Sequence, residues 1–113
     1  MRLAIIGSRT FNDYEYLKRS INDLGLEITE IVSGGTVGAD TLGERYAEEF
    51  KIPIQVYRPN WKISGRSTGF KRNLEIVENC DAVLALWDGT SKGTRNTIDQ
   101  ATKNNKTVYV RRF

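Results

Sequence analysis

Apolar residues along the chain gather in five short runs that predict β-strands. Four runs are near-continuous or rich in β-branched residues, a pattern typical of strands buried on both faces of a sheet. The last run instead alternates Val108 and Val110 with polar neighbours, which predicts an edge strand. In chain order the runs are LAII (3–6), ITEIVS (28–33), IPIQVY (52–57), AVLALW (82–87) and TVYVRR (107–112).

Between these runs, apolar residues recur every three or four positions and predict four helices. Asn12 or Asp13 is suited to cap the first helix, and Gly25 is suited to end it. Ser67 or Thr68 precedes the third helix. The apolar stripes are Tyr14, Leu17, Ile21 and Leu24, then Ala39, Leu42, Tyr46, Ala47 and Phe50, then Phe70, Leu74 and Val77, and a weaker fourth over 94–104 around Ile98 and Ala101.

The alternation of strands and helices predicts an α/β domain whose parallel sheet carries helices on both faces. We therefore expect a Rossmann-like three-layer αβα sandwich, with five mainly parallel strands in the order 3-2-1-4-5. The 113 residues fit one domain, 1–113, because domains usually hold about 100–200 residues.

Composition narrows the chemistry that the chain can perform. There is no histidine, which excludes Ser-His-Asp catalysis and every His-ligated zinc site, and we predict no metal site. Cys80 is the single cysteine, and we expect a buried thiol in a reducing cytoplasm. No apolar run approaches the roughly 20 residues that a membrane span needs. A net charge of +3 mildly favours an anionic partner.

Glycine-rich loops follow three of the predicted strands: GSR (7–9), SGGTVGAD (33–40) and WDGTSKGT (87–94). Carboxyl ends of parallel strands share one edge of a sheet, which is where open α/β sheets bind ligands. In the order 3-2-1-4-5, the first and third of these loops face each other across the crevice between strands 1 and 4. Neither the dinucleotide-binding GxGxxG motif nor the phosphate-binding P-loop occurs in them.

The loops carry donors suited to a phosphate. Gly35 and Gly38 have no Cβ, so phosphate oxygens are expected to reach main-chain N–H groups and the N-terminus of the second helix. Arg66 and Arg72 are expected to clamp a phosphate, with the unusually long loop 58–67 closing as a lid, and Trp61 to stack on a base. The candidate ligand-binding residues are Gly7, Ser8, Arg9, Ser33, Gly34, Gly35, Gly38, Asp40, Trp61, Arg66, Arg72, Asn73, Asp88, Gly89, Ser91, Gly93 and Thr94.

Carboxylates beside these loops are the candidates for catalysis, namely Asp40, Asp88 and Glu44, with Asp99 further along. A carboxylate near a glycosidic bond stabilises an oxocarbenium-like transition state. Asp40 alternatively accepts a ribose hydroxyl or only complements the helix macrodipole. Asp88 touches ligand or forms an Asx-turn over Gly89. The sequence does not choose among these roles.

The order of motifs resembles the SLOG superfamily, and most closely its YspA/YpsA-like branch. The resemblance covers nearly the whole chain. It rests on Gly7-Ser8-Arg9, Ser33 to Asp40, Pro59 with Trp61, Gly65 and Gly69 with Arg72-Asn73, and Asp88 to Thr94. It implies a Rossmann-like fold with a nucleotide-derivative pocket lined by these loops. The superfamily includes LOG phosphoribohydrolases, domains thought to sense NAD or ADP-ribose-like signals, and DNA-processing protein A.

The resemblance also separates the functional hypotheses. Hydrolytic members carry PGG-x-GT-x-x-E with a catalytic glutamate, whereas this chain has Thr97 at that position and no PGG. We therefore predict that the domain binds or senses an ADP-ribose-, NAD- or nucleoside-monophosphate-like ligand. The alternative is a hydrolase that cleaves an N-ribosyl or phosphate linkage of a small nucleotide, and the third reading is nucleic-acid binding. A homo-oligomer is expected, and no membrane partner.

Overall fold

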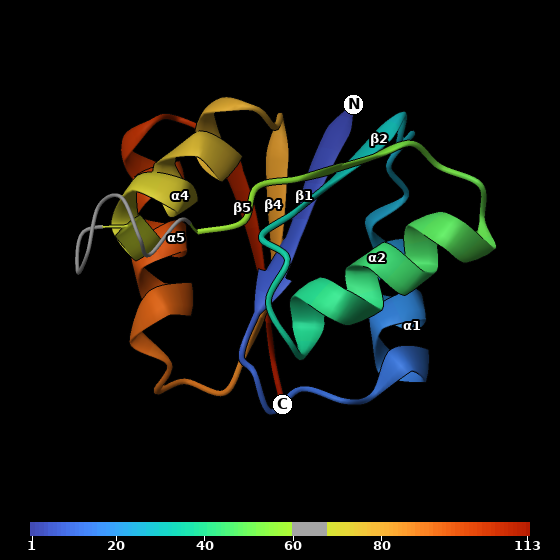
Figure 1. The fold of residues 1–113 in the computed structure, drawn as a ribbon. Coiled ribbons are helices and arrows are strands. Elements are labelled where there is room, and N and C mark those ends of the chain that lie inside the picture. The colour runs from blue at the N-terminus through green and yellow to red at the C-terminus, as the bar shows by residue number, and fades with distance from the viewer. Residues whose placement is uncertain (60–67) are drawn as a thin grey trace.

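The computed structural model describes residues 1–59 and 68–113, and it contains one five-stranded parallel sheet in the order β3-β2-β1-β4-β5 (Figure 1). This order is the predicted one, and every pairing is parallel. The strands are β1 (Arg2–Gly7), β2 (Glu30–Ser33), β3 (Ile54–Val56), β4 (Ala82–Trp87) and β5 (Thr107–Arg112).

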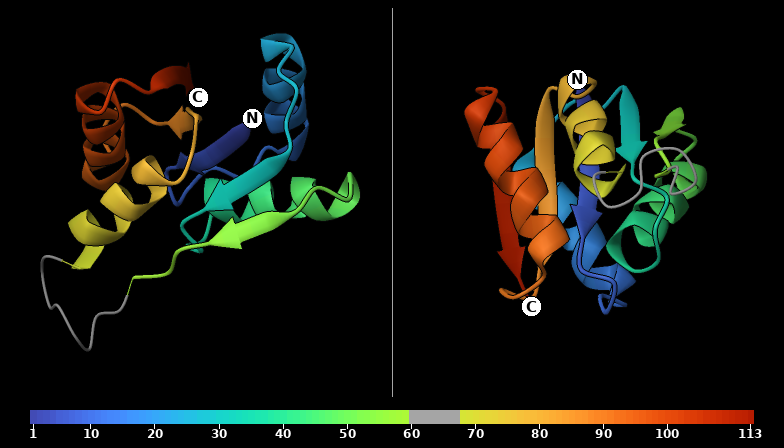
Figure 2. Two further views of the ribbon diagram at one scale, coloured as in Figure 1. Left: turned by 90° about the horizontal axis from the view of Figure 1, so that it is seen from above. Right: turned by 60° about the vertical axis from the view of Figure 1, so that its left-hand side comes forward.

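Helices cover both faces of the sheet, which confirms the predicted Rossmann-like sandwich. One face carries α1 (Tyr14–Leu24) and α2 (Ala39–Glu49), and the other carries α4 (Thr68–Glu78) and α5 (Lys92–Lys103), as the views from above and from the side show (Figure 2). The direction in which the chain winds reverses between β1 and β4, so these two central strands flank the topological switch point.

Successive side chains of β1 point to opposite faces of the sheet, so they contribute to two separate parts of the hydrophobic core. Leu3 and Ile5 pack into the cluster under α1 and α2, while Ala4 and Ile6 pack into the cluster under α4 and α5. These buried apolar contacts on both faces explain why the run reads as near-continuously hydrophobic. The central strands, and with them their carboxyl ends, are therefore held in place from both sides.

The limits of α1 follow the predicted signals. Asp13 is the N-cap, and its carboxylate accepts the N–H of Tyr16 at 3.0 Å. Gly25 ends the helix in the left-handed conformation, with φ of 60°. The residue that follows α5, Asn104, and the residue that follows α2, Phe50, instead keep negative φ values.

Two predictions from apolar patterns are wrong. The run 52–57 predicts a strand buried on both faces, but β3 is a three-residue edge strand and Ile54 is 40% exposed. The apolar stripe of the third helix predicts that Phe70 faces the core, yet Phe70 is 57% exposed. Over residues 69–78 of α4, the buried side chains are those of Asn73, Ile76 and Val77. Packing of α4 against α5 has rotated the buried face by about one residue toward a polar side chain.

Among the helices that the structure describes, none is long and apolar enough to span a membrane. Cys80 is fully buried, as predicted, and burial raises the pKa of its thiol to about 11.

Candidate functional site

A crevice of about 320 Å³ opens at the switch point, between the carboxyl ends of β1 and β4. It combines the loop after β1, the start of α2, the middle of α4, the loop after β4 and the beginning of α5. Its lining residues are Ile6, Gly7, Ser8, Arg9, Thr10, Thr36, Asp40, Arg72, Asn73, Ile76, Asp88, Ser91, Lys92, Gly93, Thr94 and Thr97.

A hydrogen-bonded cluster joins the two loops that face each other across this crevice. The Ser8 hydroxyl oxygen accepts the N–H of Asp88 at 3.1 Å and lies 2.9 Å from the Ser91 hydroxyl. Ser8 is buried, and its own N–H donates to the carbonyl of Leu86 at 2.9 Å. The loop after β1 is therefore tied to β4 and to the loop that leads into α5.

The carboxylate of Asp88 organises the loop that contains it. One of its oxygens accepts the N–H groups of Thr90 and Ser91, each at 2.8 Å, and the Ser91 hydroxyl donates to the carboxylate at 3.0 Å. These donors hold the pKa of Asp88 well below its usual range. This is the Asx-turn geometry, in a side chain that also lines the crevice.

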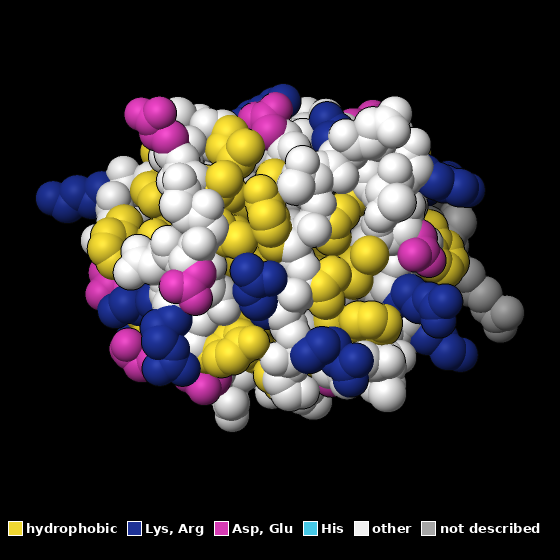
Figure 3. All heavy atoms as spheres, turned by 180° about the vertical axis from the view of Figure 1, so that it is seen from behind, with side chains coloured by type: hydrophobic (Ala, Val, Ile, Leu, Met, Phe, Trp, Pro, Cys, Tyr) yellow, Lys and Arg dark blue, Asp and Glu magenta, His cyan; other side chains and the backbone are white. Residues whose placement is uncertain are grey.

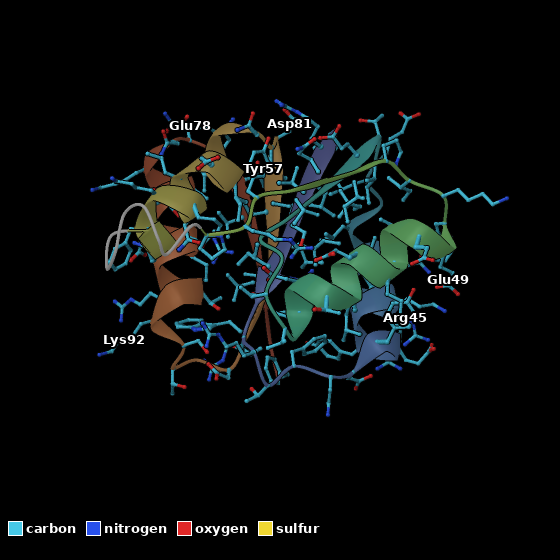
Figure 4. All side chains as sticks on the ribbon, viewed as in Figure 1. Arg45, Glu49, Tyr57, Glu78, Asp81 and Lys92 are labelled. Carbon is cyan, nitrogen blue, oxygen red and sulfur yellow. The ribbon has the colours of Figure 1, made fainter. Side chains whose placement is uncertain are left out.

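The first turn of α5 presents main-chain donors to the crevice. N–H groups in the first turn of a helix have no partner within the helix. Lys92, Gly93 and Thr94 occupy this turn, and all three line the crevice. A Cβ on Gly93 would meet no atom of the described residues within 4 Å. The helix terminus and the open backbone at Gly93 are suited to an anionic group. Lys92 is labelled at this end of α5 in Figure 4.

Around the SGG segment, the protein itself occupies the space that the glycines leave. The guanidinium of Arg72 donates to the carbonyl of Gly34 at 2.6 Å, and that of Arg58 donates to the carbonyl of Gly35 at 2.9 Å. The N–H of Gly35 is already bonded to the Ser33 hydroxyl at 3.1 Å. The close approach that the glycines predicted is therefore made by two arginine side chains.

The third glycine of this loop allows two backbone segments to cross. Gly38 has φ of 87°, and a Cβ there would collide with the main chain of Ser8 and Arg9. Ala39 begins α2 directly after it, with its N–H 3.4 Å from the carbonyl of Ser8. Gly38 thus brings the start of α2 against the loop after β1, and it does not line the crevice itself.

Arg72 is fixed in place by a network that runs between α4 and α5. Its Nε donates to Asn73 Oδ1 at 2.9 Å, and Asn73 Nδ2 in turn donates to Asn96 Oδ1 at 2.9 Å. Gln100 donates to the same Asn96 oxygen at 2.7 Å. Burial lowers the pKa of Arg72, but the neighbouring Asp40 opposes this shift. An arginine that is held by two hydrogen bonds, to Asn73 and to the carbonyl of Gly34, is preorganised to meet an anion.

Asp40 is a buried carboxyl group at the start of α2, 3% exposed. Burial raises its pKa to about 6, although the Arg72 guanidinium and hydrogen bonds from Thr36 act in the opposite direction. Glu44, one turn further along α2, adds a smaller upward contribution. A carboxyl group that titrates near pH 6 can hold or release a proton close to neutrality.

The structure separates the predicted residues into three groups. Gly7, Ser8, Arg9, Asp40, Arg72, Asn73, Asp88, Ser91, Gly93 and Thr94 line the crevice. Ser33, Gly34, Gly35, Gly38, Glu44 and Gly89 do not line it, and Glu44 instead accepts the Ser33 hydroxyl at 2.9 Å. Trp61 and Arg66 lie outside the described residues.

Six lining residues are not among the candidates from the sequence: Ile6, Thr10, Thr36, Ile76, Lys92 and Thr97. Lys92 and Thr10 stand in or beside loops that were recognised, so treating each whole loop as a candidate would have included them. Ile6 and Ile76 read as core residues in the sequence, because an apolar pattern does not distinguish a pocket wall from a filled core.

Comparison with known proteins yields a family, a relative and a structural neighbour. Residues 1–63 match the model of the "YspA, cpYpsA-related SLOG family". The chain is 32% identical over 114 residues to the Gene 61 protein of Mycobacterium phage D29, which covers 90% of this chain and 89% of that protein.

One structural neighbour is DNA processing protein A (DprA) from Streptococcus pneumoniae, solved by X-ray crystallography. It superposes with a TM-score of 0.79 at 18% sequence identity over 96% of this chain. The match spans 49% of the DprA chain, so this chain corresponds to about half of that protein. At this identity the similarity shows a shared fold.

Proposed function

The chain belongs to the YspA, cpYpsA-related SLOG family, and from this premise we propose that its crevice binds a phosphorylated nucleoside ligand. The ligand class is ADP-ribose-, NAD- or nucleoside-monophosphate-like. The phosphate is placed against the first turn of α5 and the loop after β1. In this proposal the domain binds or senses the nucleotide and does not convert it.

One observation carries this proposal: three kinds of anion donor converge on a single crevice. The first turn of α5 supplies main-chain N–H groups, and Ser8 supplies a hydroxyl group that only accepts in its contacts with Asp88 and Ser91. Arg9, in the loop after β1, and Arg72, in α4, supply positive charge, and the exposed Lys92 adds a further cation at the N-terminal end of α5. Side chains that are already ordered by hydrogen bonds lose little freedom on binding, which favours affinity.

The test is a thermal-unfolding scan with AMP, ADP-ribose, NAD and the nucleoside monophosphates, followed by calorimetric titration of any ligand that shifts the midpoint. A ligand at about 100 times its Kd adds roughly 2.7 kcal/mol of stability. A shift with a nucleotide supports the proposal. No shift with any of them, together with binding of a single-stranded oligonucleotide that weakens steeply with salt, would replace it with nucleic-acid binding.

Matched charge variants test the location of the site. Arg9→Ala and Lys92→Ala each remove a cation that lines the crevice. Arg95→Ala removes an exposed cation of α5 that instead faces Asp99 at 3.9 Å. We expect the first two to weaken binding about 5- to 50-fold and Arg95→Ala to leave it unchanged. Equal effects of all three variants would show that net charge alone controls binding, and would contradict a binding site in the crevice.

A second function is favoured by Asp40, whose raised pKa is suited to acid–base work. We propose as the alternative that the domain hydrolyses an N-ribosyl or phosphate linkage of the bound nucleotide. Among the three candidate carboxylates, Asp40 lines the crevice and has a pKa raised to about 6. Asp88 also lines the crevice, but its carboxylate accepts hydrogen bonds from the main chain of its own loop. Glu44 does not line the crevice, and its carboxylate accepts the hydrogen bond of the Ser33 hydroxyl.

Chromatography of the same protein–nucleotide mixtures distinguishes the two functions. A pure binding module leaves the nucleotide intact over hours. A hydrolase releases base or phosphate, and Asp40→Asn then lowers turnover at least about 100-fold while Kd changes little. Turnover that survives in Asp40→Asn would exclude Asp40 as the catalytic acid or base.

A further inference from the structure

The two edges of the sheet differ in how they are protected. β3 is only three residues long and follows Pro53, and both features disfavour pairing with a strand of another molecule. β5 is six residues long, contains no proline, and runs from Thr107 to Arg112. Figure 3 views the molecule from behind, on the side of β5, and shows apolar side chains gathered along this part of the surface. Val110 is 37% exposed there and Phe113 is 46% exposed.

Hydrogen bonds identify the main-chain groups of β5 that point away from the sheet. The N–H of Phe113 donates to the carbonyl of Trp87 in β4 at 3.4 Å, so the odd-numbered positions bond inward. The alternation leaves the main-chain N–H and C=O of Val108, Val110 and Arg112 directed outward. The carbonyl of Arg112 agrees with this direction, because it accepts the Tyr16 hydroxyl from α1 at 2.9 Å.

We propose that β5 pairs antiparallel with β5 of a second copy of this chain about a twofold axis at Val110, so that the two sheets become one. This interface is independent of the ligand proposed for the crevice. Twofold pairing uses the same surface on both copies. It also gives the outward N–H groups of β5 partners in the second copy. The carbonyls of Val110 and Arg112, which already accept the Arg111 guanidinium at 3.2 Å and the Tyr16 hydroxyl at 2.9 Å, each accept a second hydrogen bond in this pairing.

The charges on β5 favour this axis over those at Tyr109 and Arg111, and an axis at Val108 would pair Val110 with Lys106, which lies before the start of β5. With the axis at Val110, Arg112 lies opposite Val108 of the second copy and Arg111 lies opposite Tyr109. An axis at Tyr109 would place Arg112 opposite Lys106, and an axis at Arg111 would place that residue opposite itself. Like charges directly opposite each other destabilise a strand pair, whereas arginine beside an aromatic ring is favourable.

Side chains on both faces fit the same register. Val108 belongs to the core under α4 and α5, and Tyr109 packs against the core under α1 and α2. With the axis at Val110, the two exposed Val110 side chains meet at the centre on the α5 side. Phe113, which packs on Phe11 with ring centroids 4.9 Å apart, lies opposite Thr107 of the second copy on the other side.

Single-cysteine variants test the register directly. In an antiparallel hydrogen-bonded pair the Cα atoms lie about 5.5 Å apart, which a disulfide can bridge. Val110→Cys is therefore expected to give a covalent dimer in mild oxidant. Thr107→Cys and Ile54→Cys are matched exposed controls, the first on β5 but away from the axis and the second on β3. Cys80 is buried and does not compete.

Sedimentation from about 1 µM to about 500 µM tests the interface without cross-linking. We expect the wild type to approach twice 12.8 kDa as its concentration rises. Val110→Glu, which opposes two carboxylates at the axis, should weaken association at least tenfold, and Ile54→Glu should not. Wild-type protein that stays monomeric throughout, or Thr107→Cys that cross-links as well as Val110→Cys, would overturn the proposal.

Discussion

The hydroxyl oxygens of Ser8 and Ser91 lie 2.9 Å apart and join two loops that are 83 positions apart in the sequence. The first loop follows β1 and the second follows β4, so this contact closes the floor of the crevice at the switch point. Neither serine belongs to a helix or strand. Their meeting depends on β1 and β4 being neighbours in the sheet.

Ser8→Ala is expected to destabilise the protein by roughly 1–3 kcal/mol. The change leaves the N–H of Asp88 and the Ser91 hydroxyl without their shared, buried partner. Urea unfolding measures the loss. Thr102→Ala is the control, because its exposed hydroxyl bonds only within α5 and its removal should cost less than about 0.5 kcal/mol. Equal losses in the two variants would contradict a special role for the Ser8 contact.

Asp40→Asn is expected to be more stable than the wild type above pH 6. The folded-state pKa of about 6 lies above the ordinary value of 3.8, so between these values the folded state binds more protons than the unfolded state. The free energy of unfolding of the wild type therefore falls as the pH rises from about 4 to 6, by an amount on the order of 3 kcal/mol.

Urea unfolding of both proteins at pH 4.5 and pH 7.5 checks this sign. The asparagine has no proton to lose, so the gap between variant and wild type should open with rising pH. A variant that is less stable than the wild type at pH 7.5 would show that the ionised Asp40 is fully compensated by its neighbours.

Gly93→Ala is expected to leave the fold intact and to weaken ligand binding. A Cβ at Gly93 meets no described atom within 4 Å, and alanine favours helix by up to about 1 kcal/mol over glycine. The added methyl group instead enters the space in front of the first turn of α5. Thermal unfolding and nucleotide titration of the same sample separate the two effects.

Gly38→Ala is the counterpart and should act in the opposite way. Its φ of 87° and the main chain of Ser8 oppose any side chain, so we expect the free energy of unfolding to fall by about 2 kcal/mol or more.

For Gly93→Ala, an unchanged affinity for the nucleotide would show that the phosphate does not bind at the N-terminal end of α5.

Cys80 is expected to resist thiol reagents in the folded protein. Its side chain is fully buried and its pKa is raised to about 11, so at pH 8 only about one thiol in a thousand is ionised. Reaction with Ellman's reagent should be slow in buffer and complete within minutes in concentrated urea. Rapid labelling in buffer would show that the segment between α4 and β4 opens readily.

The fold was largely predictable because its signals are local. Short apolar runs such as 82–87 identify central strands, and Asp13 and Gly25 mark the limits of α1 through main-chain preferences that need no partner. The prediction failed for Ile54 and Phe70, because the burial of an apolar residue depends on which element covers it. A three-residue edge strand has no neighbour on one side, and α4 turns the polar Asn73 inward to reach Asn96.

For the site, the sequence by itself determined which loops meet, since parallel strands in the order 3-2-1-4-5 bring their carboxyl ends to one edge. Only the tertiary structure decided what each loop residue faces. Gly34 and Gly35 receive arginine side chains, Gly93 remains open to the crevice, and Asp40 is buried deeply enough to raise its pKa. Glycines and carboxylates have the same local preferences in all of these roles, so the surrounding packing, which joins residues distant in the chain, distinguishes them.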